Sequence, residues 1–150
     1  MEQIGAEWLQ GRASLGAAGG WTAEEMRLVA DVGYALAEQG RDDEAITIFE
    51  GLVALAPATA YFQASLGALW LRKGEPRRAV EYLDAALASD PTDLNALTNR
   101  GEALLQLGEP EAGRRDLRRV AQSQAAVWES EADCVKRARA LLNAGGSAGA

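Results

Sequence analysis

Apolar residues recur along most of this chain at intervals of three and four, the spacing that places them on one face of an α-helix. Short breaks rich in glycine, proline and acidic residues separate these stretches. The pattern predicts helices near residues 3–13, 23–39, 42–55, 59–73, 76–89, 93–107, 110–124 and 127–142. We therefore expect an all-α fold.

The second predicted helix has a clear N-terminal capping signal. Thr22 followed three residues later by Glu25 has the spacing of a capping box, in which each side chain accepts a hydrogen bond from the backbone N–H of the other residue. Trp21 and Met26 flank it with the spacing of a hydrophobic staple. The helix is expected to begin at about residue 23.

The pattern repeats with a period of 34 residues. Four columns share this spacing: Gly33, Gly67 and Gly101; Gly40, Gly74 and Gly108; Ala45, Ala79 and Gly113; and Phe49, Leu83 and Leu117. Pro57 and Pro91 close the first two units, and Ala125 stands at the matching place in the third. We set the units at 26–59, 60–93 and 94–127, within a repeat region of 22–127.

Helix packing gives these columns a physical meaning. The first glycine lets the two helices of a unit approach closely, and the second lies in the turn between them, where a positive φ costs it little. The small and the large residue then interlock where the helices cross. Because one isolated pair would leave an apolar face bare, the three units are expected to stack into a solenoid with a continuous core.

The ends of the chain complete the expected organisation. Residues 1–21 are predicted to form a short helix and a glycine-rich linker, 128–142 a helix that caps the solenoid, and 143–150 a disordered tail. Ile4, Trp8 and Leu9 give the first helix an apolar side, which is able to fold back on the first repeat.

The glycine pair at fixed 34-residue spacing, with Ala45, Phe49 and the closing prolines, resembles the tetratricopeptide repeat. This resemblance implies a right-handed helix-turn-helix solenoid of three repeats with extra helices at both ends. The order of features is also similar to that of the class II chaperones of bacterial type III secretion: an acidic lead-in, the run 40–45, Tyr61-Phe62 before Leu66-Gly67, and the run 102–108. The turn at Ala56-Pro57 departs from their pattern.

In such a stack the first helix of each pair lines the concave surface, so the resemblance implies a binding groove. Unit one would contribute Arg27, Ala30, Tyr34 and Ala37; unit two Tyr61, Ala64, Ala68 and Leu71; and unit three Asn95, Thr98, Glu102 and Leu105. The members singled out for peptide binding are Tyr34, Tyr61, Ala64, Ala68, Leu71, Asn95, Thr98, Glu102 and Leu105. The 3-4-3 spacing in unit two makes one stripe that suits an extended or helical apolar ligand, although Tyr61 and Leu71 could instead cover neighbouring helices.

The amino-acid composition limits the classes of function that the protein can have. The chain is 48% apolar and 25% charged, without a long apolar run or a basic, apolar leader, and we expect it to be cytoplasmic and not inserted in a membrane. It has one cysteine, Cys134, and no histidine, which excludes an internal disulfide and a histidine base. We expect no enzyme activity, no metal and no cofactor; a nucleophilic Cys134 is the weakest reading, because no base can activate it.

The charge of −7 is uneven, since residues 1–60 hold ten acids and three bases. An acidic chain repels nucleic acid, which is not an expected partner. Arg114, Arg115, Arg118 and Arg119 lie on one helix with Glu111 and Asp116, which indicates a solvated convex face and leaves an acidic protein partner open. The acids of Asp42-Asp43-Glu44 are explained by helix capping and the helix dipole.

The favoured hypothesis is a cytoplasmic chaperone that holds a segment of a secreted, translocator-like client in its concave groove. The alternative is a general scaffold that joins proteins into a complex, with the arginine-rich convex face as a second surface. The resemblance also implies a possible homodimer through the N-terminal helix.

Overall fold

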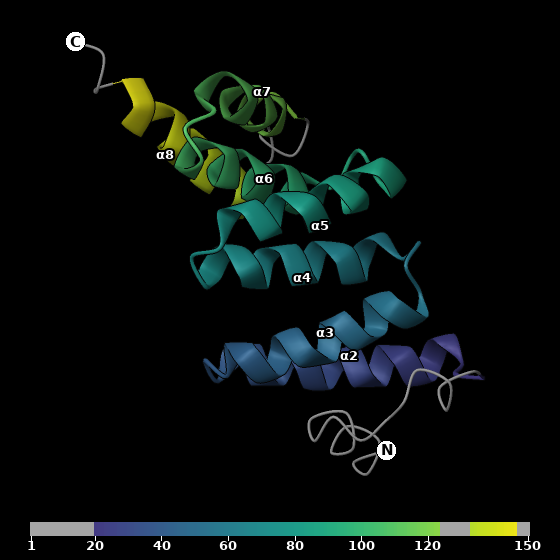
Figure 1. Ribbon diagram of the computed structural model, residues 1–150. Helices are drawn as coiled ribbons and strands as arrows, with labels where there is room; N and C mark the ends of the chain where they lie inside the picture. Colours follow the sequence, from purple (N-terminus) through teal and green to yellow (C-terminus); the bar gives the residue numbers. More distant parts are fainter. Residues whose placement is uncertain (1–19, 124–132, 147–150) are drawn as a thin grey trace.

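A computed structural model describes residues 20–123 and 133–146 of the chain (Figure 1). Within these ranges all regular structure is helical: α2 (Ala23–Glu38), α3 (Asp42–Leu55), α4 (Ala60–Arg72), α5 (Pro76–Ser89), α6 (Leu94–Gln106), α7 (Pro110–Ala121) and α8 (Asp133–Gly146). Figure 1 shows the helices stacked in chain order, with α2 and α3 at one end and α8 beside α6 and α7 at the other. The predicted solenoid of three helix-turn-helix units is confirmed.

The predicted helices match the observed ones within two or three residues through α7. The last helix differs, because it continues to Gly146 and so includes part of the segment expected to be a disordered tail. The predicted helix at 3–13, most of the glycine-rich linker and residues 147–150 lie outside the described residues.

Each unit is held together where its first glycine meets its large apolar residue. A Cβ atom at Gly67 would lie 2.6 Å from Leu83 Cγ, and one at Gly101 would lie 2.7 Å from Leu117 Cγ. In the first unit, a Cβ atom at Gly33 would lie 2.7 Å from an edge carbon of the Phe49 ring. These distances are too short for a real Cβ, so the helices cross at a separation that only glycine permits. The large partner is fully buried in all three units.

The second glycine column lies in the turns within the units. Gly40, Gly74 and Gly108 have φ values of 75°, 83° and 79°. Side chains other than glycine rarely adopt this left-handed conformation, which ends the first helix and lets the chain reverse direction. The 34-residue period therefore reflects the left-handed backbone conformation of the turns as well as the packing of the helices.

The predicted capping box at α2 is present. The backbone N–H of Thr22 donates to Glu25 Oε2 over 2.7 Å, and that of Glu25 donates to Thr22 Oγ1 over 3.2 Å. These bonds satisfy donors that would otherwise have no partner at the helix start. They also hold the pKa of Glu25 below its usual value, because the backbone N–H and hydroxyl of Thr22 stabilise the carboxylate.

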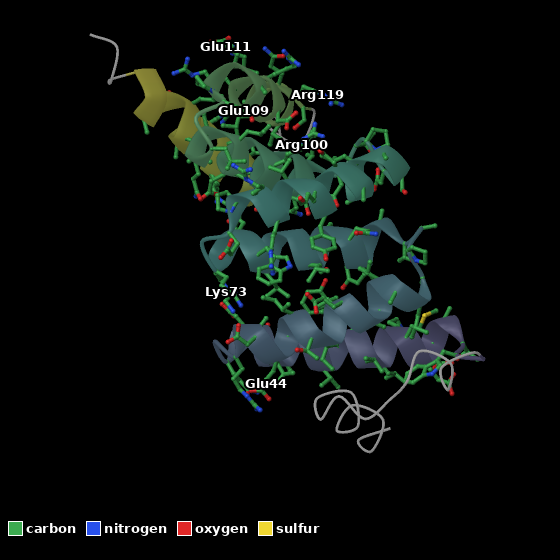
Figure 2. The ribbon with its side chains drawn as sticks, viewed as in Figure 1. Glu44, Lys73, Arg100, Glu109, Glu111 and Arg119 are labelled. Carbon is green, nitrogen blue, oxygen red and sulfur yellow. The ribbon has the colours of Figure 1, made fainter. Side chains whose placement is uncertain are left out.

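The acids at the start of α3 lie in its first turn, as expected of residues that favour the helix dipole, and two of them also form ion pairs with residues of the next repeat. No side chain caps this helix; instead Asp42 pairs with Arg72 and Asp43 with Lys73, both at the end of α4. Lys73 reaches across toward α3 in Figure 2. These ion pairs join the first repeat to the second across the exposed edge of the stack.

Helix α8 closes the far end of the solenoid. It packs on α7 and α6, and its Val135 and Ala138 are fully buried. Cys134 is buried as well, and burial raises the pKa of its thiol, as expected of a packing residue. Its backbone carbonyl accepts a 3.4 Å hydrogen bond from Thr98 Oγ1 of α6. The last helix therefore supplies the cap that a solenoid end requires.

The described helices lack two features. None of them is both long and apolar enough to cross a membrane. No group of three or more acidic or cysteine side chains within residues 20–123 and 133–146 is placed to hold a metal ion.

Candidate functional site

The first helices of the three units surround an open hollow of about 420 Å³ on the concave side. We call it the groove. It is lined by Tyr34, Ala37 and Glu38 of α2, Phe49 of α3, Tyr61, Ala64, Ser65, Ala68, Leu69 and Arg72 of α4, and Asp93, Asn95, Ala96 and Asn99 at the start of α6. The floor is mainly apolar and the rim is polar, which is the usual build of a binding site.

Tyr34 is fixed on one wall of the groove. Its ring meets Phe49 edge to face, with centroids 5.2 Å apart, and its hydroxyl forms a hydrogen bond with Ser65 of the next unit. Burial is the main reason that the pKa of Tyr34 is raised well above its usual value. The side chain thus stays neutral at physiological pH and links α2 to α4.

Tyr61 stands beside it and remains open to solvent. Its ring centroid lies 5.7 Å from that of Tyr34 and 5.9 Å from that of Phe62, yet its side chain is 53% exposed. Large apolar residues in the described chain are otherwise mostly buried, Val32 being the other exposed one. A half-exposed aromatic ring above an apolar floor is a surface that gains free energy when a partner covers it.

Small residues keep the floor open. Ala64 and Ala68 lie one helical turn apart on α4 and are half-buried, as is Ser65, whose hydroxyl also donates to the Tyr61 carbonyl over 2.8 Å. Larger side chains at these places would fill the hollow. The alanines therefore keep the groove deep, and the tyrosines form its wall.

The charged rim is held by internal contacts. Arg72 is the cationic side chain that lines the groove, and it donates to Asp42 and to the Ala37 carbonyl. At the other end Asp93 accepts a 3.1 Å hydrogen bond from the backbone N–H of Ala96 as the N-cap of α6. Asn95 is exposed at this end. The groove thus offers amide groups, but its cation is already paired.

Five of the nine residues singled out from the sequence line the groove: Tyr34, Tyr61, Ala64, Ala68 and Asn95. The structure places the others elsewhere. Leu71 is only 7% exposed, packs in the core and does not line the groove. Thr98 is fully buried because α8 covers it.

The remaining two residues are engaged by neighbouring helices. Glu102 pairs with Arg137 of α8, which also donates to Asn99 over 3.0 Å. Leu105 is half-buried and packs beside Gly113 at the crossing of α6 and α7. The concave surface of the third unit is therefore largely taken up by α8. Of the predicted companions from unit one, Ala30 is buried and Arg27 lies outside the groove.

The sequence reasoning missed several lining residues. Phe49 reaches the groove from α3, a second helix, because the glycine at 33 leaves room for its ring to pass. Ser65 could have been found, since it lies one turn after Tyr61 on the same face. The spacing of residues along the chain does not predict that the side chains of Phe49 and Arg72 extend across to neighbouring helices.

Comparison with protein families supplies the classification. Tetratricopeptide repeat models match residues 32–59 and 66–127, which together make up more than half of the chain. The chain is a tetratricopeptide repeat protein. The matches lie on the same helix pairs that the 34-residue columns define. The comparison with curated protein sequences found no significant match.

Several solved structures of similar shape come from type III secretion. A type III secretion complex from Aeromonas hydrophila is 27% identical, with a TM-score of 0.75 over 96% of this chain and 95% of that one. PcrH, solved with the chaperone-binding region of PopD, is 22% identical, with a TM-score of 0.76 over 87% of this chain and 98% of its own. The translocator chaperone SycD of Yersinia enterocolitica is 19% identical, with a TM-score of 0.73 over 88% and 98%. This repeat protein shares their fold along nearly their whole length.

Proposed function

We propose that this protein is a cytoplasmic chaperone that holds an extended or helical apolar segment of a secreted, translocator-like client in the groove. The observation that carries the proposal is the exposed ring of Tyr61 above a floor of alanines, inside a hollow shared by all three units. The similarity to PcrH, which was solved with the chaperone-binding region of PopD, supports the same assignment.

The groove chemistry favours an apolar internal segment over a charged one. Covering the exposed half of Tyr61 contributes about 1 kcal/mol, from the usual gain for burying a large side chain. A terminal carboxylate would need a free cation, and Arg72 is already committed to Asp42. Binding should therefore depend on shape and apolar contact, and it should survive raised salt.

A blocked groove gives a direct test. We expect the translocator proteins of the protein's own host to co-purify with it when co-expressed. Ala68→Arg should abolish this recovery, because a long charged side chain would occupy the floor, and Tyr61→Ala should weaken it. Ala88→Arg is the matched control, since Ala88 is exposed on α5 and does not line the groove.

Two results would contradict the proposal. If no translocator of the host is recovered with the unaltered chain, the client assignment is wrong. If Ala68→Arg and Ala88→Arg recover the client equally, with both variants melting as the unaltered chain does, the groove is not the site of binding.

The scaffold hypothesis differs from this proposal in its dependence on charge. A complex made through the arginine-rich convex face should dissociate in half-molar salt, whereas a groove complex should persist. Homodimerisation through the N-terminal segment remains a prediction, since Ile4, Trp8 and Leu9 lie outside the described residues. Light scattering of the intact chain measures it.

A further inference from the structure

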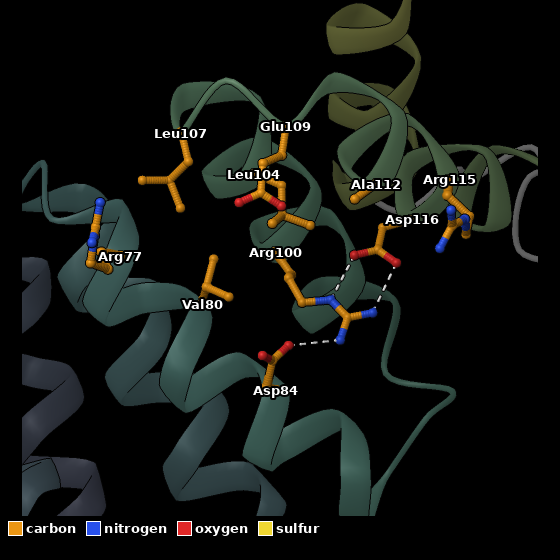
Figure 3. Close-up of a pocket in the computed structure, with 10 residues that line it drawn as sticks. All are labelled: Arg77, Val80, Asp84, Arg100, Leu104, Leu107, Glu109, Ala112, Arg115 and Asp116. Atoms are coloured by element: carbon orange, nitrogen blue, oxygen red, sulfur yellow. Dashed lines mark hydrogen bonds and ion pairs between the residues drawn. The ribbon is translucent and has the colours of Figure 1, made fainter.

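A second hollow opens beside α6, against residues of this helix that do not line the groove. It measures about 540 Å³ and lies between α5 and α7, with α6 beneath (Figure 3). We call it the outer hollow. Its lining comprises Arg77, Val80 and Asp84 of α5, Arg100, Leu104 and Leu107 at α6, and Glu109, Ala112, Arg115 and Asp116 at α7.

The base of the outer hollow is a fixed charge network. Arg100 donates to both carboxylate oxygens of Asp116, over 2.6 and 2.9 Å, and to Asp84 over 2.9 Å (Figure 3). Asp116, expected from the sequence on a solvated face, is only 3% exposed. The bidentate contact ties α6 to α7, and the contact to Asp84 extends the tie to α5. Because these carboxylates balance its charge, Arg100 forms a rigid floor for the hollow and is not a free cation.

Two other arginines at the hollow have no such partner. Arg77 on α5 and Arg115 on α7 are exposed, and neither forms an ion pair or side-chain hydrogen bond within the described ranges. In Figure 3 they stand on opposite sides, with the apolar side chains of Val80 and Leu104 between them. The arrangement is an apolar strip with a free cation at each side.

Helix α7 carries four arginines, although the chain has a net charge of −7, and Arg115 is the one of them that lines the outer hollow. On this helix Arg114 and Arg118 line a separate hollow beside α8, and Arg119 donates to the Pro91 carbonyl. Of the two acids on α7, Asp116 is neutralised by Arg100, which leaves Glu111 as the acid at the surface. The lining carries three basic and three acidic side chains, so an acidic partner would be attracted by the unpaired Arg77 and Arg115 and not by a net positive charge of the hollow.

We propose that the outer hollow is a second docking site, for a protein segment that carries an aliphatic side chain flanked by acidic residues. The aliphatic side chain would lie on Val80 and Leu104, and the acidic groups would pair with Arg77 and Arg115. Glu109 stands at the rim near the turn between α6 and α7. It sets the orientation, because an acidic group beside it would be repelled.

Nucleic acid fits the same surface less well. A phosphate backbone would have to pass Glu109 and Asp84, and no aromatic side chain lines the hollow for a base to stack on. An acidic peptide meets neither difficulty, since its charges need to fall only at Arg77 and Arg115.

The test uses the full chain with the groove closed by Ala68→Arg, so that the outcome does not depend on the proposed chaperone function. A phage-displayed library of short random peptides is selected on this protein. We expect enriched peptides that combine an aliphatic residue with Asp or Glu on both sides. Their affinity, measured by fluorescence anisotropy, should fall about tenfold with Arg77→Glu and Arg115→Glu combined. It should rise with Glu109→Gln.

The control is Arg27→Glu combined with Arg118→Glu, which changes the net charge equally away from the outer hollow and should leave the affinity within about twofold. Three results would overturn the proposal: no enriched peptide, enriched peptides without acidic residues, or binding that Arg77→Glu and Arg115→Glu leave intact. Tight binding of short single-stranded DNA that this double variant abolishes, without peptide enrichment, would assign the surface to nucleic acid. Melting curves establish that each variant is folded.

Discussion

Replacing Gly67 with alanine should destabilise the protein, although alanine is by far the better helix former. A methyl group at this position would lie 2.6 Å from Leu83 Cγ, 2.9 Å from its Cδ2 and 3.2 Å from the Ala79 carbonyl oxygen. Leu83 is fully buried and cannot turn away into solvent. Relieving the contact requires α4 and α5 to move apart or Leu83 to leave its rotamer.

The magnitude follows from two opposing terms. Overpacking of this severity costs about 2 to 3 kcal/mol, the upper part of the usual range. The helix propensity of alanine over glycine returns about 1 kcal/mol. We therefore expect Gly67→Ala to lower the free energy of unfolding by about 1 to 2 kcal/mol. Urea denaturation followed by circular dichroism measures this change, and the melting temperature should fall by about 2 to 4 °C per kcal/mol.

A double-mutant cycle with Leu83→Ala isolates the contact. Leu83→Ala alone should cost about 2 to 5 kcal/mol, because it leaves a cavity in the core. In that background the methyl group at position 67 no longer meets a leucine, and Gly67→Ala should then raise the stability by up to about 1 kcal/mol. If Gly67→Ala stabilises the unaltered chain, or has the same effect in both backgrounds, the glycine does not set the helix separation and the reasoning is wrong.

Three further predictions concern charge and accessibility. Asp116→Asn should lower the free energy of unfolding by about 2 to 4 kcal/mol, since Arg100 would lose its buried partner; urea denaturation checks this. Because the folded pKa of Tyr34 is raised, its contribution to stability is fully present below pH 10 and is lost as the pH rises above that value; Tyr34→Phe should make the alkaline loss of stability less steep. Cys134 is the single cysteine, and it is buried with a raised pKa. A thiol reagent should therefore react with it slowly until urea is added. Arg137→Ala should speed this reaction, because it removes the ion pair with Glu102 and loosens α8.

Much of the fold could be read from the sequence because its determinants are local and repeated. The spacing of 16 residues between Gly67 and Leu83 corresponds to one helix-turn-helix, so both residues fall at the same crossing in every unit. The turn glycines and the capping box act within a few residues of chain. The sequence could place Tyr34, Tyr61 and the alanines of α4 in the groove, because a helix of known phase presents them on one face.

What the sequence could not supply is the identity of the residues that stay exposed once neighbouring elements are in place. Thr98 has the same position in its unit as Ala64, but α8 covers Thr98 and leaves Ala64 open. The lining of the outer hollow includes the pair of Arg100 with Asp116, a contact between two helices that the 34-residue spacing does not predict. The amino-acid sequence determined the repeat, its turns and its helix crossings, since these depend on residues close along the chain. The tertiary structure decided which surfaces remain available to a partner, because exposure depends on everything that packs nearby.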